Sequence, residues 1–212
     1  MVKLDIFSDP ICPWCYIGTK NLFNVLKSES SFVFEIEWHP FLLNPEMPDQ
    51  GMDRREYLEE KFGGKEAAIK AYLPVVEHAN AADLSFDFAA IQKTPNTLKA
   101  HCLIRWAHIE GCQNEMAEAL FSAYFCKGLD IGDAAVLTEV AEAVGFNPIL
   151  IKRLFSSSDE RLEIQNKDKS AKEMGIQAVP AFIIAGQYVV NGAQSPDLWR
   201  SVMKDIKNKD EH

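Results

Sequence analysis

The 212-residue sequence has no excess of positive charge and no long apolar run. Its formal net charge is −9 and its isoelectric point is about 5.1. This charge argues against nucleic acid as a partner, because phosphate binding needs clustered Lys and Arg. No stretch approaches the roughly 18 apolar residues of a membrane-spanning helix, and the first residues lack the basic and apolar regions of a secretory signal. We therefore expect a cytoplasmic protein that binds neither nucleic acid nor a membrane.

Cysteine is scarce, and the five cysteines present do not form a zinc signature. Structural zinc normally takes four Cys or His ligands, whereas the sequence contains a single CxxC, at Cys12 and Cys15, and no matching second pair. An odd cysteine count in a reducing compartment also argues against a disulfide framework. We expect no metal site. We interpret Cys102, Cys112 and Cys126 as unpaired thiols, with Cys102 a packing residue on the apolar stripe of its helix.

The CxxC motif lies between an apolar run, residues 2–7, and a helix-like segment, residues 14–26. In a helix that starts near Cys12, Cys15 falls on the apolar face and should point into the core. Cys12 falls at the positive end of the helix dipole, where unpaired backbone N–H groups stabilise a thiolate. We therefore expect Cys12 to be exposed and nucleophilic and Cys15 to be shielded. Thiol–disulfide exchange needs such an asymmetry, because one sulfur attacks a disulfide and the other resolves the mixed disulfide.

Three neighbouring residues are candidates for tuning this centre. Pro13 and Trp14 separate the two cysteines, and the neutral indole adds no positive charge that would favour a thiolate. We therefore predict a couple less oxidising than the periplasmic oxidants of similar chemistry. Asp9, three residues before Cys12, either caps the coming helix or accepts a proton near the thiols, and the preference of aspartate for the N-cap favours the first role.

Two regions of mixed strand and helix pattern flank a long helical one. Alternating residues predict a strand over residues 32–38, and helical patterns follow from about residue 54. Pro74 should kink or split one of these helices, and Thr94-Pro95 should supply the N-cap and first residue of another.

Strand patterns return near the C-terminal end of the sequence. Gly186-Gln187 separates two short strand-like runs and predicts a two-residue loop with a type II′ turn. Without residues 45–155, the remaining order is strand, helix, strand, helix, hairpin, helix. We therefore expect an α/β protein, with a thioredoxin-like domain made of residues 1–44 and 156–212 and a large all-helical inserted domain over residues 45–155.

Four segments resemble the DsbA family of thiol–disulfide oxidoreductases, and in particular its FrnE-like branch. They are residues 8–18 around the CPWC motif, residues 95–101, residues 175–182 and residues 192–194, and they span nearly the whole chain. The resemblance implies an enzyme in which Cys12 attacks a protein or small-molecule disulfide and Cys15 resolves the mixed species.

The resemblance also implies a substrate-binding loop at Val179-Pro180. The peptide bond before Pro180 is expected to be cis, and the backbone of Val179 is expected to pair with an extended substrate, as in β-strand addition. Trp14 is expected to line the same surface. Asn96, Thr97 and His101 match the family pattern and either face the cleft between the domains or serve as capping and packing residues.

Two other functions stay open at this point. Related chains of this architecture include kappa-type glutathione transferases and 2-hydroxychromene-2-carboxylate isomerases, which use glutathione and carry serine at the position matching Cys12. The other alternative is a non-catalytic chaperone or binding module. The preferred interpretation needs no cofactor, allows glutathione as a co-substrate, and takes a disulfide-containing protein or a small thiol as partner, with the chain a monomer or homodimer.

Overall fold

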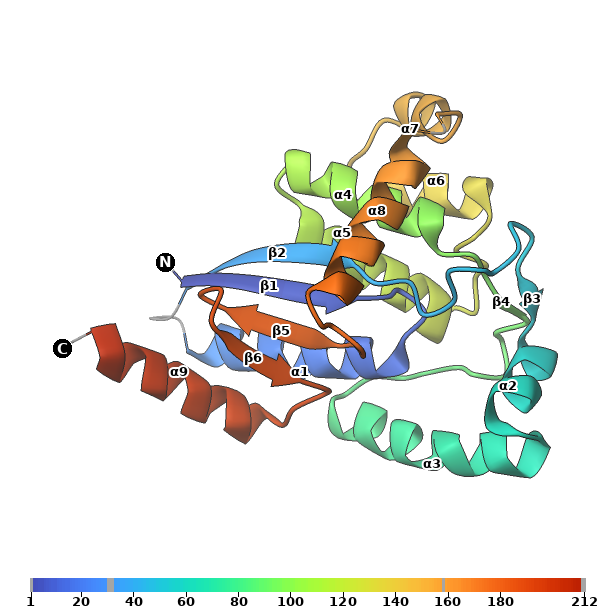
Figure 1. Ribbon diagram of the computed structural model, residues 1–212. Coiled ribbons are helices and arrows are strands. Elements are labelled where there is room, and N and C mark those ends of the chain that lie inside the picture. Colours follow the sequence, from blue (N-terminus) through green and yellow to red (C-terminus); the bar gives the residue numbers. More distant parts are fainter. Residues whose placement is uncertain (1, 30–32, 158, 211–212) are drawn as a thin grey trace.

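The computed structural model describes residues 2–29, 33–157 and 159–210 (Figure 1). A four-stranded sheet of order β2-β1-β5-β6 lies at its centre, with β1 parallel to β2, and β5 antiparallel to both β1 and β6. Helices α1 and α9 contact one another on one side of the sheet, and α8 crosses the other side against β2 (Figure 1). The bounds are β1 Val2–Ser8, α1 Pro13–Ser28, β2 Phe34–Pro40, α8 Asp159–Glu173, β5 Ala181–Ile184, β6 Tyr188–Asn191 and α9 Pro196–Asp210.

The predicted inserted segment is mainly helical. Its first two helices form an arm beside the N-terminal end of α1, and the remaining helices stack above the sheet (Figure 1). A short antiparallel pair, β3 with β4, is added to the helices. The bounds are β3 Met52–Asp53, α2 Arg54–Phe62, α3 Lys65–Ala81, β4 Lys93–Thr94, α4 Leu98–Ile109, α5 Gln113–Phe121, π-helix η1 Ser122–Cys126, α6 Ala134–Ala143 and α7 Pro148–Leu154. No helix in the described ranges has the length and apolarity needed to cross a bilayer.

One hydrophobic core joins the sheet to the inserted helices. Leu4 and Ile6 of β1 belong to the same buried cluster as Leu103 of α4 and Phe125 of η1, and Cys15 lies in it too. The alternation predicted for the second strand is confirmed in part, since Phe34 and Trp38 are buried and Glu35 is exposed, whereas Ile36 and Glu37 are both half-buried. Phe32, where the strand was predicted to begin, lies outside the described residues. The boundaries proposed at residues 44/45 and 155/156 fall between elements, and the division into two domains stays a prediction.

Two predictions for the helical region differ from the structure. The predicted split at Pro74 is wrong, because Pro74 lies inside α3, which continues through it to Ala81, while the alternative of a kink stays a prediction. The helix persists because its buried residues, Ala68, Val75 and Ala79, pack on one face and offset the loss of one backbone donor.

The second error concerns the start of α4. Thr94 ends β4, where it pairs with Met52, and α4 begins only at Leu98 with Thr97 in the N-cap position. Because the backbone at residue 94 is taken up by the β3–β4 ladder, Pro95 cannot open the helix.

The hairpin between β5 and β6 differs from the predicted type II′ turn. Ile184 pairs with Tyr188, so the loop has three residues rather than two. Ala185 and Gly186 have positive φ of 51° and 67°, and Gln187 N–H donates to Ile184 O at 3.1 Å. Two successive positive φ values are the pattern of a type I′ turn with an added residue, which follows the twist of the strands.

Candidate active site

The two cysteines of the CPWC motif sit at the start of α1. Cys12 is the N-cap residue, Pro13 occupies the first turn, and the Cys12 sulfur accepts a hydrogen bond from Cys15 N–H at 3.4 Å. Both cysteines are free thiols. The Cys12 sulfur therefore lies where the helix presents its unpaired N–H groups.

The predicted exposure of Cys12 is wrong, whereas the predicted shielding of Cys15 is confirmed. Cys12 is only 4% exposed and Cys15 is fully buried. Burial, followed by the hydrogen bond that the Cys15 thiol donates to the Cys12 side chain, raises the pKa of Cys15 well above its ordinary value, while Ser8 and the Asp9 backbone N–H partly counter this. Cys15 is thus a protonated thiol at neutral pH, held beneath Cys12.

Asp9 does not cap α1, because Cys12 holds that position, so the predicted cap role is wrong. Its fully buried carboxylate joins three separate segments. Oδ1 accepts from Ile11 N–H at 3.2 Å, and Oδ2 accepts from Leu43 N–H at 2.8 Å and from the Thr97 hydroxyl at 3.4 Å. Burial raises the pKa of Asp9 to about 6, although these hydrogen bonds oppose the shift.

The loop before β5 lies directly against Cys12. The Val179–Pro180 peptide bond is cis, as the resemblance implied. The Cys12 thiol donates to Val179 O, with 3.7 Å between sulfur and oxygen. Segments 167 residues apart in the sequence therefore meet at the reactive sulfur.

Gly18 allows the chain to approach α1 closely at this point. A Cβ at Gly18 would lie 3.1 Å from Ala193 Cα and 3.2 Å from the Pro180 ring. One turn further along, Asn21 Nδ2 donates to Gln194 O at 2.9 Å. Three of the four sequence segments that carry the family resemblance are thus packed against one another.

A cavity of about 250 Å³ opens beside Cys12. Its wall includes Cys12, Pro13 and Trp14 on one side and Val179 on another, and α2 and α3 supply most of the rest. The Trp14 ring meets the His78 ring of α3 edge-on, with 5.3 Å between centroids. The inserted helices therefore cover the sulfur, which explains why Cys12 is buried despite its place at a helix end.

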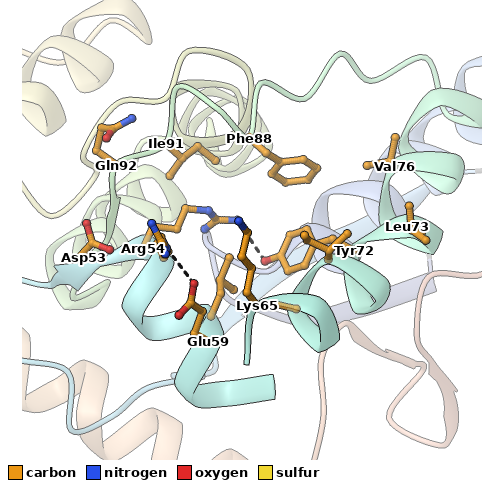
Figure 2. A pocket seen from close by; sticks show the side chains of 14 residues that line it. Asp53, Arg54, Glu59, Lys65, Tyr72, Leu73, Val76, Phe88, Ile91 and Gln92 are labelled. Atoms are coloured by element: carbon orange, nitrogen blue, oxygen red, sulfur yellow. Dashed lines mark hydrogen bonds and ion pairs between the residues drawn. The ribbon is translucent and has the colours of Figure 1, made fainter. Parts of the chain in front are cut away.

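The cavity wall contains residues for which the sequence offered no signal. Arg54 and Lys61 of α2 are its charged members, and Tyr72 and Tyr124 add hydroxyl groups. A larger cavity of about 510 Å³, between α2 and α3, shares Arg54 and Tyr72 with it (Figure 2). Arg54 is buried, while the adjacent Arg55 side chain is 76% exposed. Nothing in a run of two arginines distinguishes them before the helix is placed.

Asn96, Thr97 and His101 do not line the cavity beside Cys12. Asn96 Nδ2 donates to Met47 O at 2.7 Å, and Thr97 contacts Asp9. His101 is buried against β2, and burial lowers its pKa to about 3. These positions agree with the packing alternative and give no support to contact with a substrate.

The remaining cysteines lie away from the motif. Cys102 is 2% exposed, and burial raises its pKa to about 12, which agrees with its predicted packing role. Cys112 precedes α5 and Cys126 ends η1, and both are half-buried free thiols. Neither contributes to the cavity wall.

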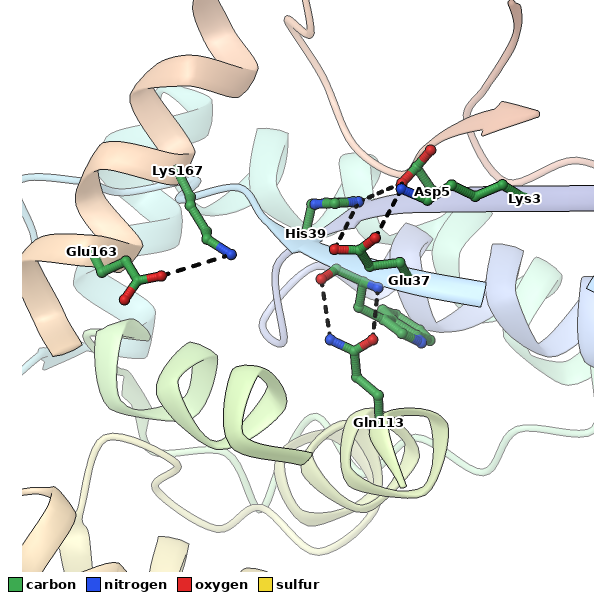
Figure 3. A network of polar contacts seen from close by, with 8 residues as sticks. Lys3, Asp5, Glu37, His39, Gln113, Glu163 and Lys167 are labelled. Carbon is green, nitrogen blue, oxygen red and sulfur yellow. Dashed lines mark hydrogen bonds and ion pairs between the residues drawn. The ribbon is translucent and has the colours of Figure 1, made fainter. Parts of the chain in front are cut away.

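An ion-pair network links side chains of the adjacent strands β1 and β2 (Figure 3). Asp5, Glu37 and His39 bring potential metal-ligand atoms within 4.8 Å of one another. Lys3 Nζ lies 3.1 Å from the Asp5 carboxylate and 2.9 Å from that of Glu37, and His39 Nε2 lies 2.6 Å from Asp5. Lysine thus supplies the countercharge that the two carboxylates need.

The two cysteines thus lie at a helix start, on a thioredoxin-like sheet, with a cis-proline loop beside them. The model of the family described as the DSBA-like thioredoxin domain matches residues 3–204. The chain belongs to this family.

Individual relatives agree with this assignment. The uncharacterized protein YwbO of Bacillus subtilis (strain 168) is 28% identical, with 98% of each chain covered. The probable DsbA oxidoreductase SCO1869 from Streptomyces coelicolor superposes with a TM-score of 0.86 at 21% identity, over 97% of this chain and 89% of that one. The cytosolic disulfide reductase DsbM from Pseudomonas aeruginosa, solved with GSH, superposes with a TM-score of 0.69 at 16% identity. The match covers 97% of this chain and 99% of that one. At these identities the solved structures show the shared fold.

Proposed function

We propose that this protein is a thiol–disulfide oxidoreductase in which Cys12 is the attacking sulfur and Cys15 the resolving one. The observation that carries the proposal is the position of the Cys12 sulfur, at the N-cap of α1, against Val179 O, and in the wall of a cavity. A sulfur at a helix start is where N–H groups favour the thiolate that exchange requires.

The proposed reaction has two steps. The Cys12 thiolate attacks one sulfur of a substrate disulfide, forming a mixed disulfide and releasing the other half as a thiolate that takes a proton from solvent. The Cys15 thiol then gives up its proton and attacks the Cys12 sulfur, which releases the second half as a thiol. The substrate gains two electrons, and the protein is left with a Cys12–Cys15 disulfide. The reverse sequence oxidises a dithiol.

Burial of Cys15 supports this division of roles. Because its raised pKa keeps Cys15 protonated, Cys15 does not compete for the first attack. It becomes a nucleophile only once Cys12 carries a partner. The Val179 carbonyl and the Trp14 ring in the cavity wall support a role for both in holding the substrate.

The finer assignments remain part of the proposal. The sequence segments support the FrnE-like branch, and three unpaired thiols outside the motif support a reducing compartment such as the cytoplasm. The neutral Trp14 supports a weakly oxidising couple, which equilibration in glutathione redox buffers measures. The two cysteines support redox chemistry over the glutathione-dependent isomerase alternative, in which the first sulfur is replaced by a hydroxyl.

Trapping of the mixed disulfide tests the proposal. Cys15→Ser protein, reduced and then exposed to a small disulfide such as glutathione disulfide, should gain one adduct on Cys12 that mass spectrometry locates by peptide. Cys12→Ser protein should gain none at position 15, because that thiol is buried and protonated. Cys102→Ser serves as a matched control at a buried cysteine outside the site. An unmodified Cys12 in the first variant would refute the assigned role.

A further inference from the structure

Arg54 is a buried cation surrounded by neutral groups. It is 7% exposed and begins α2. Nη1 donates to the Tyr124 hydroxyl at 2.8 Å. Nη2 donates to the Tyr72 hydroxyl at 3.1 Å (Figure 2). The rings of Tyr72, Phe88 and Tyr124 lie 5.5 to 5.7 Å from the guanidinium carbon. These contacts orient the guanidinium and leave its charge unneutralised.

The acidic side chains that line the larger cavity with Arg54 have other partners. Asp53 accepts the Glu56 N–H at 3.0 Å as the N-cap of α2. Glu59 pairs with Arg55 at 2.8 Å (Figure 2). Within the described residues, no ion pair involves Arg54. A buried charge without a counter-ion is costly, and proteins normally pair it or neutralise it. An anion from outside the chain would supply the countercharge that these contacts do not provide.

Arg54 lines both cavities, and the smaller of them also contains Cys12, so an anion bound there would lie beside the candidate reactive sulfur. Arg54 shares the wall of the 250 Å³ cavity with Cys12, and Lys61 is the other charged residue of that wall. Lys61 Nζ donates to the Tyr57 hydroxyl at 2.9 Å, so this cation too contacts a neutral group. Among the described residues, the wall of this cavity includes two cations and no carboxylate, in a chain whose net charge is −9.

We propose that Arg54 binds a carboxylate of a small disulfide substrate whose sulfur lies against Cys12. This inference rests on the proposed oxidoreductase function and specifies its substrate class. The planar guanidinium fork matches the two oxygens of a carboxylate, and the confined volume suits one small molecule. In the mixed disulfide, the half of the substrate attached to Cys12 keeps its carboxylate on Arg54 while Cys15 attacks the Cys12 sulfur. Lys61 adds a second attraction at the cavity rim.

Paired disulfides of equal shape test the inference. Reduced wild-type protein is mixed with 3,3′-dithiodipropionic acid or with its neutral diamide, and the rate of Cys12 oxidation is followed by quenched alkylation. Each rate is divided by the rate of the same disulfide with dithiothreitol, which removes intrinsic reactivity. The normalised preference for the acid should be about 10- to 100-fold, the size expected for a charge-assisted hydrogen bond.

Two matched variants separate Arg54 from general charge effects. Arg54→Gln should bring the preference for the acid close to 1, whereas Arg55→Gln removes the same charge from the next, exposed side chain and should keep it. If Arg54→Gln does not fold, the carboxylate site is tested with Arg54→Lys and with the normalised acid-to-diamide rate ratio of the wild-type protein. A wild-type ratio near 1 with both disulfides reacting would overturn the carboxylate site and leave the oxidoreductase function standing. If neither disulfide oxidises Cys12, both proposals fail.

Discussion

The buried carboxylate of Asp9 should make this protein lose stability as pH rises from about 4 to 7. Asp9 is fully buried, and its pKa is raised from 3.8 to about 6. Below pH 3.8 the carboxyl is protonated in both the folded and the unfolded chain. Between the two pKa values the folded chain holds a proton that the unfolded chain releases. Above pH 6 both are ionised, and the folded protein bears the full cost of burying the charge.

The size of the effect follows from the shift. A difference of about 2 pKa units at about 1.4 kcal/mol per unit makes the Asp9 contribution about 3 kcal/mol less favourable at pH 8 than at pH 3. About 2 kcal/mol of this change falls between pH 4.5 and pH 8, a range in which unfolding is readily measured. The hydrogen bonds from Leu43 and Thr97 favour the ionised form, and the pKa of about 6 already includes their effect, so they do not change the sign.

Comparison of wild type with Asp9→Asn isolates this contribution. The free energy of unfolding of each protein, kept reduced, is measured by urea titration from pH 4.5 to pH 8. Asparagine cannot accept from both Ile11 and Leu43, so the variant should be less stable at every pH, by about 1–3 kcal/mol at neutral pH. The decisive quantity is the free energy of unfolding of wild type minus that of Asp9→Asn. This difference should be about 2 kcal/mol larger at pH 4.5 than at pH 8. Groups common to both proteins, including His101, cancel in this difference.

Asp197→Asn is the matched control, because its carboxylate is 92% exposed. It accounts for the general effect of removing one negative charge from a chain of net charge −9. If the difference in free energy of unfolding between wild type and Asp9→Asn is constant across the pH range, or increases toward pH 8, the reasoning from burial is contradicted.

Two further outcomes test the packing around the site. Gly18→Ala should lower the free energy of unfolding by about 1–2 kcal/mol in urea titrations, because the new methyl group meets Ala193 and Pro180. This loss is expected even though alanine normally favours a helix. A gain in stability would show that the neighbouring atoms move aside without cost. His101 should stay neutral down to about pH 4, because burial lowers its pKa to about 3; NMR titration of its ring should show no midpoint near 6.5, and such a midpoint would mean that the ring is accessible to solvent.

Local sequence patterns determined many features of the fold and of the candidate site. The CPWC motif, the apolar face that buries Cys15, the alternation in β2 and the order of elements all depend on residues a few positions apart, and the structure agrees with them, although only in part with the alternation. Spacing of three, four or two residues is the periodicity of the backbone itself, so these features are readable from the sequence. The cis bond at Pro180 is different, because the family resemblance implied it and no local pattern did, and the structure confirms it.

Contacts between distant segments decided the rest. Cys12 is buried because helices some 50 residues further along the chain cover it, and Asp9 is a junction because Leu43 and Thr97 reach its carboxylate. Arg54 and Arg55 are adjacent and chemically identical, yet only Arg54 is buried among tyrosines beside the cavity. The sequence by itself determined which sulfur begins the helix; only the tertiary structure decided what surrounds it, because burial and charge pairing depend on side chains that meet after folding.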